Sequence, residues 1–150
     1  MTANHNDSSE PKRKGILLAH LIATKTTNDT VSDDDMAIPT DWQSKAYGDS
    51  HLGHKEHGRT LVIQSLAVLP AYQGRGLGKT LLMSYVQRML EGEVADQIAL
   101  LTYGRLVPFY EKMGFENRGK SKVKFGNEEW NDMVRVPDRC TAVWHTKCYC

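Results

Sequence analysis

One stretch constrains the fold more than any other: residues 61–90, which read LVIQSLAVLPAYQGRGLGKTLLMSYVQRML. The nearly uninterrupted apolar run 61–69 predicts a buried strand. A turn at Pro70 leads into the glycine-rich segment 73–78, and a helix is expected to follow directly. The first N–H groups of a helix have no partner within it, and the helix dipole adds partial positive charge there. This order of elements therefore predicts a binding site for an anion.

The helix and its loop both carry residues suited to that site. Apolar residues recur at helical spacing, in the two rows Leu77, Leu81, Tyr85, Met89 and Leu82, Val86, Leu90. Three glycines lack the side chains that would hold a phosphate away from the backbone, namely Gly74, Gly76 and Gly78. Arg75 and Lys79 add positive charge at the same place. We expect a phosphorylated cofactor here.

Spacing separates the known types of phosphate loop. Residues 78–80 match the end of the nucleotide-triphosphate loop, but Gln73 stands where that loop needs its first glycine. The dinucleotide pattern Gly-x-Gly-x-x-Gly fails as well, because Lys79 and Leu81 occupy its last glycine position in the two possible registers. The pattern that fits is Gln-x-x-Gly-x-Gly, which runs from Gln73 to Gly78.

This loop, directly after a strand that ends Leu-Ala-Val, resembles the acetyl-CoA diphosphate loop of the GNAT superfamily of N-acetyltransferases. Residues 106–115, LVPFYEKMGF, are similar to the second conserved block of that superfamily. Together the motifs cover residues 58–136 and most resemble the arylalkylamine (serotonin-type) and polyamine branch, especially its fungal members. The resemblance implies an α/β fold with a mixed central sheet flanked by helices. A domain of this family usually opens with a further strand and two helices, but only the polar residues 1–14 precede the first strand expected here. Two alternatives stay open: these elements are missing, or the sequence begins after them.

The resemblance also implies the cofactor contacts. The backbone of residues 66–68 would pair with the pantetheine arm of acetyl-CoA and offer an N–H to the thioester carbonyl, and the glycine loop would hold the diphosphate. The implied cofactor-binding residues are Leu66, Ala67, Val68, Gln73, Gly74, Arg75, Gly76, Leu77, Gly78, Lys79 and Tyr110.

Acetyl transfer to an amine needs a proton acceptor for the amine and benefits from an acid for the departing thiolate. Tyr110 matches the family tyrosine whose hydroxyl lies close to the CoA sulfur, which implies the general acid. The arylalkylamine branch carries two histidines on the central strand, where this chain has Val62 and Gln64. Gln64 is expected to hold a water in a proton wire. A direct base would come from elsewhere, with three candidates left open: His54, Glu56 and His57.

If the family geometry holds, the amine pocket is lined by Leu66, Leu101 and Phe109, which suits an aryl or alkyl chain. We expect an acetyl-CoA-dependent N-acetyltransferase that acts on a small arylalkylamine or polyamine. Protein or peptide acetylation is one alternative. A catalytically impaired module that binds CoA is another, because the N-terminal elements and the histidines are absent.

Composition predicts one domain over residues 15–136, between a disordered tail at 1–14 and an irregular tail at 137–150. The long loop 24–60 carries an acidic run and the pattern His51, His54, His57, but without the further ligands that would close a metal site. No metal is therefore expected. Cysteines occur only in the last eleven residues, which favours a cytosolic setting. A net charge of +1 gives no indication of nucleic-acid or membrane binding.

Other elements follow from shorter patterns. Strands are expected at 15–23 and 97–102, and a helix at 106–113 with Gly114 after its end. Residues 122–125 and 130–136 read as two antiparallel strands about the turn Gly126-Asn127.

Overall fold

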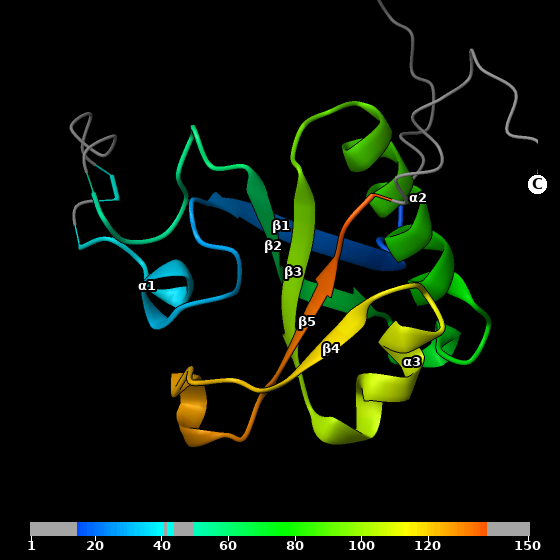
Figure 1. Cartoon of the computed structure of the whole chain (residues 1–150). Helices are drawn as coiled ribbons and strands as arrows, with labels where there is room; N and C mark the ends of the chain where they lie inside the picture. Colours follow the sequence, from blue (N-terminus) through cyan, green and yellow to red (C-terminus); the bar gives the residue numbers. More distant parts are fainter. Residues whose placement is uncertain (1–14, 41, 44–49, 138–150) are drawn as a thin grey trace, which may run out of the picture.

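The computed structural model describes residues 15–40, 42–43 and 50–137. A five-stranded sheet of order β1-β2-β3-β5-β4 forms its centre (Figure 1). The strands are β1 (Ala19–Thr26), β2 (Thr60–Val68), β3 (Gln97–Thr102), β4 (Glu116–Lys120) and β5 (Asn131–Arg135). Strands β2 and β3 are parallel, and the other neighbouring pairs are antiparallel. The mixed sheet that we expected is therefore confirmed.

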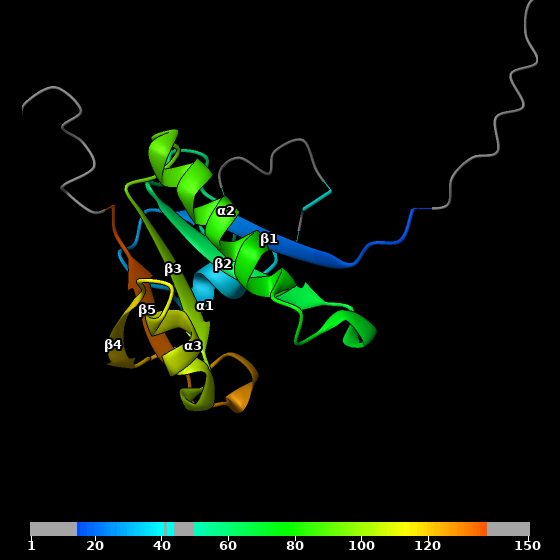
Figure 2. The ribbon, with the colours of Figure 1, turned by 90° about the vertical axis from the view of Figure 1, so that its right-hand side faces the viewer.

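Helices cover both faces of the sheet. The helices are α1 (Asp33–Met36), α2 (Leu77–Glu91) and α3 (Val107–Glu111), and the short 3-10 turns are η2 (Pro70–Tyr72), η3 (Gly104–Leu106) and η4 (Phe125–Asn127). Leu82 and Val86 of α2 and Val107 of α3 pack on the main core together with residues from the centre of the sheet. Met36 of α1 packs on a smaller cluster, which includes Val62. Figure 2 shows α2 along one face of the sheet, with α1 behind it.

The two central strands separate halfway along their length. The parallel ladder starts at Thr60 opposite Gln97 and ends at Ile63 opposite Leu100. Beyond that point β2 runs on to Val68 but stays paired only with β1, while β3 pairs only with β5. The two strands diverge in Figure 2. The backbone edge of residues 64–68 that faces β3 is consequently left without a strand partner.

A bulge in β2 lies at the point of divergence. Ile22 of β1 pairs with Ser65 and Ala23 pairs with Ile63, so Gln64 is the extra residue. A bulge bends its strand and increases the local twist. This bend accounts for the departure of β2 from β3.

The expected strands at 61–69 and 97–102 and the helix after the glycine loop are confirmed. The expected helix at 106–113 is present but shorter, preceded by η3, and Gly114 beyond it has the left-handed φ of +80°. The expected strand at 15–23 was placed too early, since β1 begins at Ala19 and continues to Thr26. Apolar Ile16 and Leu17 mimic a strand start, although both side chains are exposed.

Two further expectations were wrong. The loop 24–60 is not entirely irregular, because Ser32 and Asp35 form a capping box that starts α1. The segment 122–125 forms no strand, and β5 pairs instead with β4 at Glu116–Lys120, whose polar side chains are mostly exposed at the sheet edge. A half-buried alternation is therefore missing from its sequence. The tails predicted at 1–14 and, apart from Pro137, at 137–150 lie outside the described residues.

Candidate functional site: a glycine loop beside a divided sheet

The glycine loop connects the end of β2 to the start of α2. Gly74 and Gly76 have φ values of +72° and +81°, in the region that side chains rarely adopt. A Cβ built at either glycine would meet nothing within 4 Å, so the backbone there is open to a ligand. No side chain caps α2, and its first backbone hydrogen bond runs from the Thr80 N–H to the Gly76 carbonyl (2.9 Å). The amides of residues 77–79 thus face outward at the positive end of the helix.

Gln73 and Gly78 have a different role from the other loop residues. The Gln73 Nε2 donates to the Val68 carbonyl at 3.0 Å, which ties the loop to the end of β2. A Cβ on Gly78 would lie 3.4 Å from the Val68 Cγ2, so this glycine allows close packing of helix on strand. The structure therefore gives both residues a part in holding the loop, beside the phosphate contacts expected from the motif.

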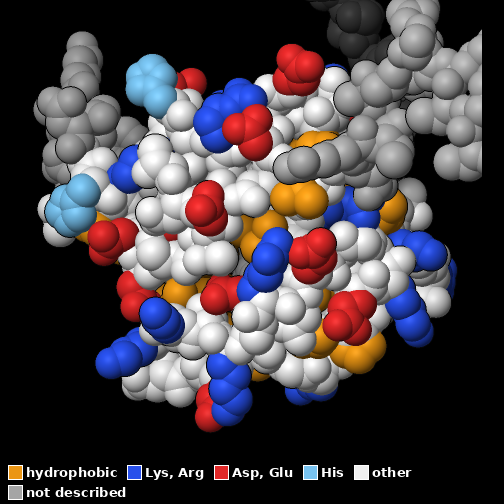
Figure 3. Space-filling view, in the orientation of Figure 1, with side chains coloured by type: hydrophobic (Ala, Val, Ile, Leu, Met, Phe, Trp, Pro, Cys, Tyr) orange, Lys and Arg blue, Asp and Glu red, His pale blue; other side chains and the backbone are white. Residues whose placement is uncertain are grey.

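Two cations flank the open amides. The Arg75 guanidinium lies over the Tyr72 ring, 5.1 Å from the ring centroid, and the Lys79 side chain is exposed. On the face shown in Figure 3, acidic and basic side chains are interspersed. An anionic ligand is favoured here by local backbone and side-chain donors rather than by overall charge.

The loop continues into the unpaired edge of β2. Leu66, Ala67 and Val68 stand on this edge, between the bulge and the glycine loop. Extended backbone without a neighbour leaves N–H and C=O groups available, and a buried or half-buried strand needs partners for them. An extended ligand with an anionic end would satisfy both the edge and the loop.

Tyr110 on α3 contributes a phenol that stays neutral. Its ring makes edge-on contacts with Phe109 (5.1 Å between centroids) and Phe115 (5.8 Å), and it packs against the main core. Burial raises the pKa of the Tyr110 hydroxyl above its usual value. The group is therefore protonated at neutral pH, as a proton donor must be.

A search against protein families decides the assignment. The model of the acetyltransferase (GNAT) domain matches residues 21–135, from β1 through β5. The chain belongs to the GNAT acetyltransferase family. Acetyl-CoA, the acyl donor of this family, has both the extended arm and the diphosphate that the unpaired strand edge and the glycine loop can accept.

Individual relatives match shorter stretches. Serotonin N-acetyltransferase of Mesocricetus auratus is 34% identical over 74 residues, which cover 49% of this chain and 36% of that protein. A histone acetyltransferase of Glycine max is 34% identical over 61 residues, 41% of this chain and 26% of that protein. The solved structure of a spermidine N-acetyltransferase chimera from Vibrio cholerae and hSSAT has 20% identity and a TM-score of 0.45, covering 52% of this chain and 51% of that one. The chain thus spans well under half the length of these curated relatives.

The three residues expected in the amine pocket of this GNAT domain do not share one face of the sheet. Leu66 packs against the main core, under α2. Leu101 packs against the smaller cluster on the other face, near α1. Phe109 lies on α3 and is 38% exposed. Within the described residues, the three side chains are therefore not brought together on one face of the sheet.

The side chain of Gln64 is held by two hydrogen bonds. Its Nε2 donates to the Thr24 Oγ1 and to the Asp35 carbonyl, both at 3.0 Å. These bonds anchor the end of α1 to the bulge. They use the donors of Gln64 and leave its Oε1 as the atom with which it could hold a water.

The candidate bases on the preceding loop lie at the wrong end of β2. The His54 Nδ1 accepts from the backbone N–H of Lys25 (3.1 Å), and Lys25 pairs with Leu61 at the start of β2. The other ring nitrogen contacts Glu56 at 3.2 Å. Five strand positions, about 16 Å, separate Leu61 from Leu66. His57 is exposed on the same loop, so these groups do not lie beside the reacting atoms expected near Leu66.

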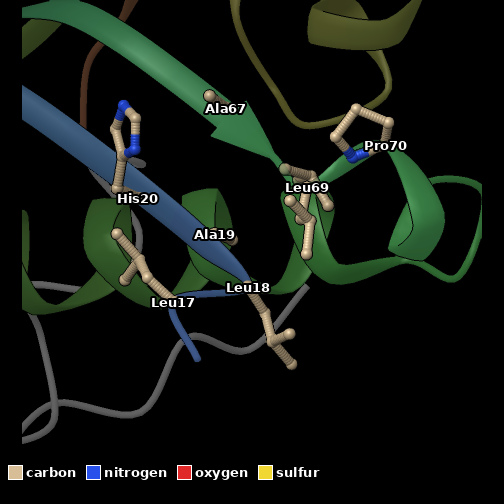
Figure 4. Close-up of a pocket in the computed structure, with 8 residues that line it drawn as sticks. Leu17, Leu18, Ala19, His20, Ala67, Leu69 and Pro70 are labelled. Atoms are coloured by element: carbon tan, nitrogen blue, oxygen red, sulfur yellow. The ribbon is translucent and has the colours of Figure 1, made fainter. Parts of the chain in front are cut away.

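The structure instead brings His20 to the divergent part of the sheet. Its Nε2 lies 3.1 Å from the Ser65 Oγ, and it lines a shallow hollow between the start of β1 and the end of β2 (Figure 4). Sequence reasoning did not select His20. The signal in the sequence was a lone polar side chain in an apolar run. Its contact with Ser65 depends on the register of β1 against β2, which residue spacing does not show.

Two other kinds of site have no counterpart among the described residues. Within the described ranges, no three His, Cys, Asp or Glu side chains are arranged to hold a metal ion. In the same part of the chain, no helix is both long and apolar enough to cross a bilayer.

Proposed function

We propose that this chain transfers the acetyl group of acetyl-CoA to a primary amine. One observation carries the proposal: β2 leaves β3 after Ile63 and then leads directly into an uncapped helix N-terminus. The strand edge suits an amide-containing arm, and the outward amides after Gly76 suit a diphosphate. Both features occur in one continuous segment of a GNAT domain.

The backbone of β2, Tyr110 and Gln64 have different roles in the proposed reaction. The backbone of residues 66–68 aligns the pantetheine arm, and one of its N–H groups supports the negative charge that develops on the thioester oxygen. The loss of such a donor typically raises the barrier by roughly 3 kcal/mol. The amine nitrogen attacks the thioester carbon, the C–S bond breaks, and the Tyr110 hydroxyl gives its proton to the departing sulfur. The raised pKa of Tyr110 keeps that proton in place beforehand. Gln64 positions the bulge through its bonds to Thr24 and Asp35.

We infer that the acceptor is a small amine of the arylalkylamine or polyamine class. The similarity to a serotonin N-acetyltransferase supports this choice. Protein acetylation is a second candidate, favoured by the similarity to a histone acetyltransferase. A module that binds CoA without turnover is the third, since the histidines of the arylalkylamine branch are replaced by Val62 and Gln64.

One experiment separates the three. The protein is incubated with acetyl-CoA and, in turn, tryptamine, phenylethylamine, spermidine or a lysine-containing peptide, and free thiol is followed over time. Release that depends on a small amine supports the proposal, whereas release with the peptide alone supports protein acetylation. Binding of CoA by calorimetry without thiol release from any acceptor identifies the binding module. No heat with CoA for a folded sample rejects all three.

A further inference from the structure

The bulge sets the direction of the side chains beside the unpaired strand edge. Leu21 pairs with Leu66, and both side chains pack on the main core under α2. Successive strand residues point to opposite faces, so Ser65 and His20 project from the other face of the sheet. Ser65 immediately precedes Leu66, the residue at which we place the thioester. A hydroxyl is therefore held next to the reaction centre.

The imidazole of His20 is in contact with that hydroxyl. The distance from the His20 Nε2 to the Ser65 Oγ is 3.1 Å, within hydrogen-bond range. Across the strand pair His20 stands opposite Ala67, and its side chain is partly buried. The His20 ring also lines the hollow drawn in Figure 4. Apart from His20, the residues that line this hollow are apolar or carry no titratable side chain: Leu17, Leu18, Ala19, Ala67, Val68, Leu69 and Pro70.

An amine acceptor must lose a proton before or during attack. Alkylammonium ions have no lone pair, and an imidazole is the side chain whose ordinary pKa lies closest to neutrality. Among the described residues, His54 and His20 each have a hydrogen bond to the sheet. His54 sits at the start of β2, whereas His20 sits level with Ala67. Only the second lies along the part of β2 that has left β3.

We propose that Ser65 and His20 form the proton relay for the acceptor amine. The Ser65 Oγ takes a proton from the ammonium and passes its own proton to the His20 Nε2, while the ring proton resides on Nδ1. The neutral amine then forms the N–C bond, and the imidazolium releases its proton through the hollow to water. The relay rests on the proposed acetyl transfer, and it supplies the proton acceptor that the sequence motif lacks.

The test uses three variants of the full chain: His20→Gln, Ser65→Ala and, as a matched control, His54→Gln. Thiol release is measured against pH with the amine that the acceptor panel identifies. In the wild-type protein we expect kcat/KM to fall on the acid side, because a protonated His20 cannot accept the proton from Ser65. His20→Gln should lose this fall and reduce kcat at pH 7 by about a hundredfold. Activity should recover at alkaline pH, where the amine itself is deprotonated.

Further readouts distinguish a relay from a structural role. Glutamine can still accept a hydrogen bond from Ser65, so the KM for acetyl-CoA and the calorimetric affinity for CoA should stay within twofold of wild type. Ser65→Ala should reproduce the pH profile of His20→Gln, and His54→Gln should keep that of the wild type. An active wild type whose profile and kcat are unchanged by His20→Gln overturns the relay alone. A wild type that binds CoA but transfers nothing overturns acetyl transfer and the relay together.

Discussion

At the scale of single residues, burial decides which groups are useful to the chemistry. Tyr110 packs its ring between Phe109 and Phe115, and the resulting rise of its pKa keeps the phenol protonated. The sequence predicted this residue through the Pro-Phe-Tyr motif. It could not predict the proposed role of His20, because that role depends on a contact with a residue of the neighbouring strand. The contact with Ser65 depends on the register shift at Gln64, and no local sequence pattern predicts that shift.

The first prediction concerns Tyr110→Phe. The substitution removes a proton donor but preserves the ring contacts, so the fold and the binding of acetyl-CoA should change little. We expect kcat to fall by about a hundredfold while the KM for acetyl-CoA stays within twofold. Steady-state kinetics with the acceptor amine measure both quantities. Equal kcat values for the two proteins would remove Tyr110 from the mechanism.

The second prediction concerns Asp132 on β5. Its Oδ1 is buried and has no hydrogen-bond partner among the described residues, and burial raises the pKa of the carboxyl although a hydrogen bond from Ser121 opposes the rise. A carboxyl whose pKa is higher in the folded state favours folding at low pH, and this contribution is lost as the pH rises through the folded pKa. The ionised form therefore destabilises the protein at neutral pH.

Asp132→Asn should accordingly stabilise the protein more at pH 7 than at pH 4. Because the side chain is partly exposed, solvent screens the charge, and we expect a gain below about 1 kcal/mol. Urea unfolding at the two pH values measures it. Asp29→Asn, at an exposed aspartate, serves as the control. A gain that is equal at both pH values would show that the charge of Asp132 has no part in it.

At the scale of elements, the loop between β2 and α2 needs glycine at its left-handed positions, and its backbone there is open to a ligand. Periodicity and motif spacing predicted β2, the loop and α2, since each has a strong local signal. They missed α1, a single capped turn, and β4, an edge strand with mostly exposed polar side chains. The divergence of β2 from β3 has no such local signal. Nothing in an apolar run shows where it changes partners.

The third prediction compares Gly76→Ala with Gly119→Ala. Both glycines have a left-handed φ, +81° and +93°, and a Cβ would meet nothing within 4 Å at either. Each substitution should therefore cost a similar free energy of unfolding, about 1–2 kcal/mol. Only Gly76→Ala places a methyl group among the amides that face the diphosphate. We expect its affinity for CoA to fall roughly tenfold, a change of about 1.4 kcal/mol, while Gly119→Ala binds normally.

Calorimetric titration with CoA and urea unfolding together check this pair. If both variants bind CoA as the wild type does, the loop at residues 73–79 is not the diphosphate site. If both lose affinity equally, the loss reflects general destabilisation rather than the place of Gly76.

At the scale of the whole molecule, ligand binding and folding are coupled. In the proposed binding mode, acetyl-CoA would contact a strand edge and a helix N-terminus that exist only in the folded state, so the ligand should stabilise the fold. At a concentration one hundred times the dissociation constant, we expect a gain of about 2.7 kcal/mol and a rise in Tm of roughly 10 °C. Thermal unfolding with increasing CoA measures the shift. Gly76→Ala should need about ten times more ligand for the same shift.

The divided sheet has one more consequence. From Ser65 to Val68, β2 is bonded to β1 on one edge and unbonded toward β3 on the other. The acyl donor would enter this gap as a surrogate strand, contributing the missing rungs between two halves of a sheet that the polypeptide alone does not close. Binding of acetyl-CoA would then also complete the sheet. The sheet would be continuous only in the complex with acetyl-CoA, which is the state that reacts.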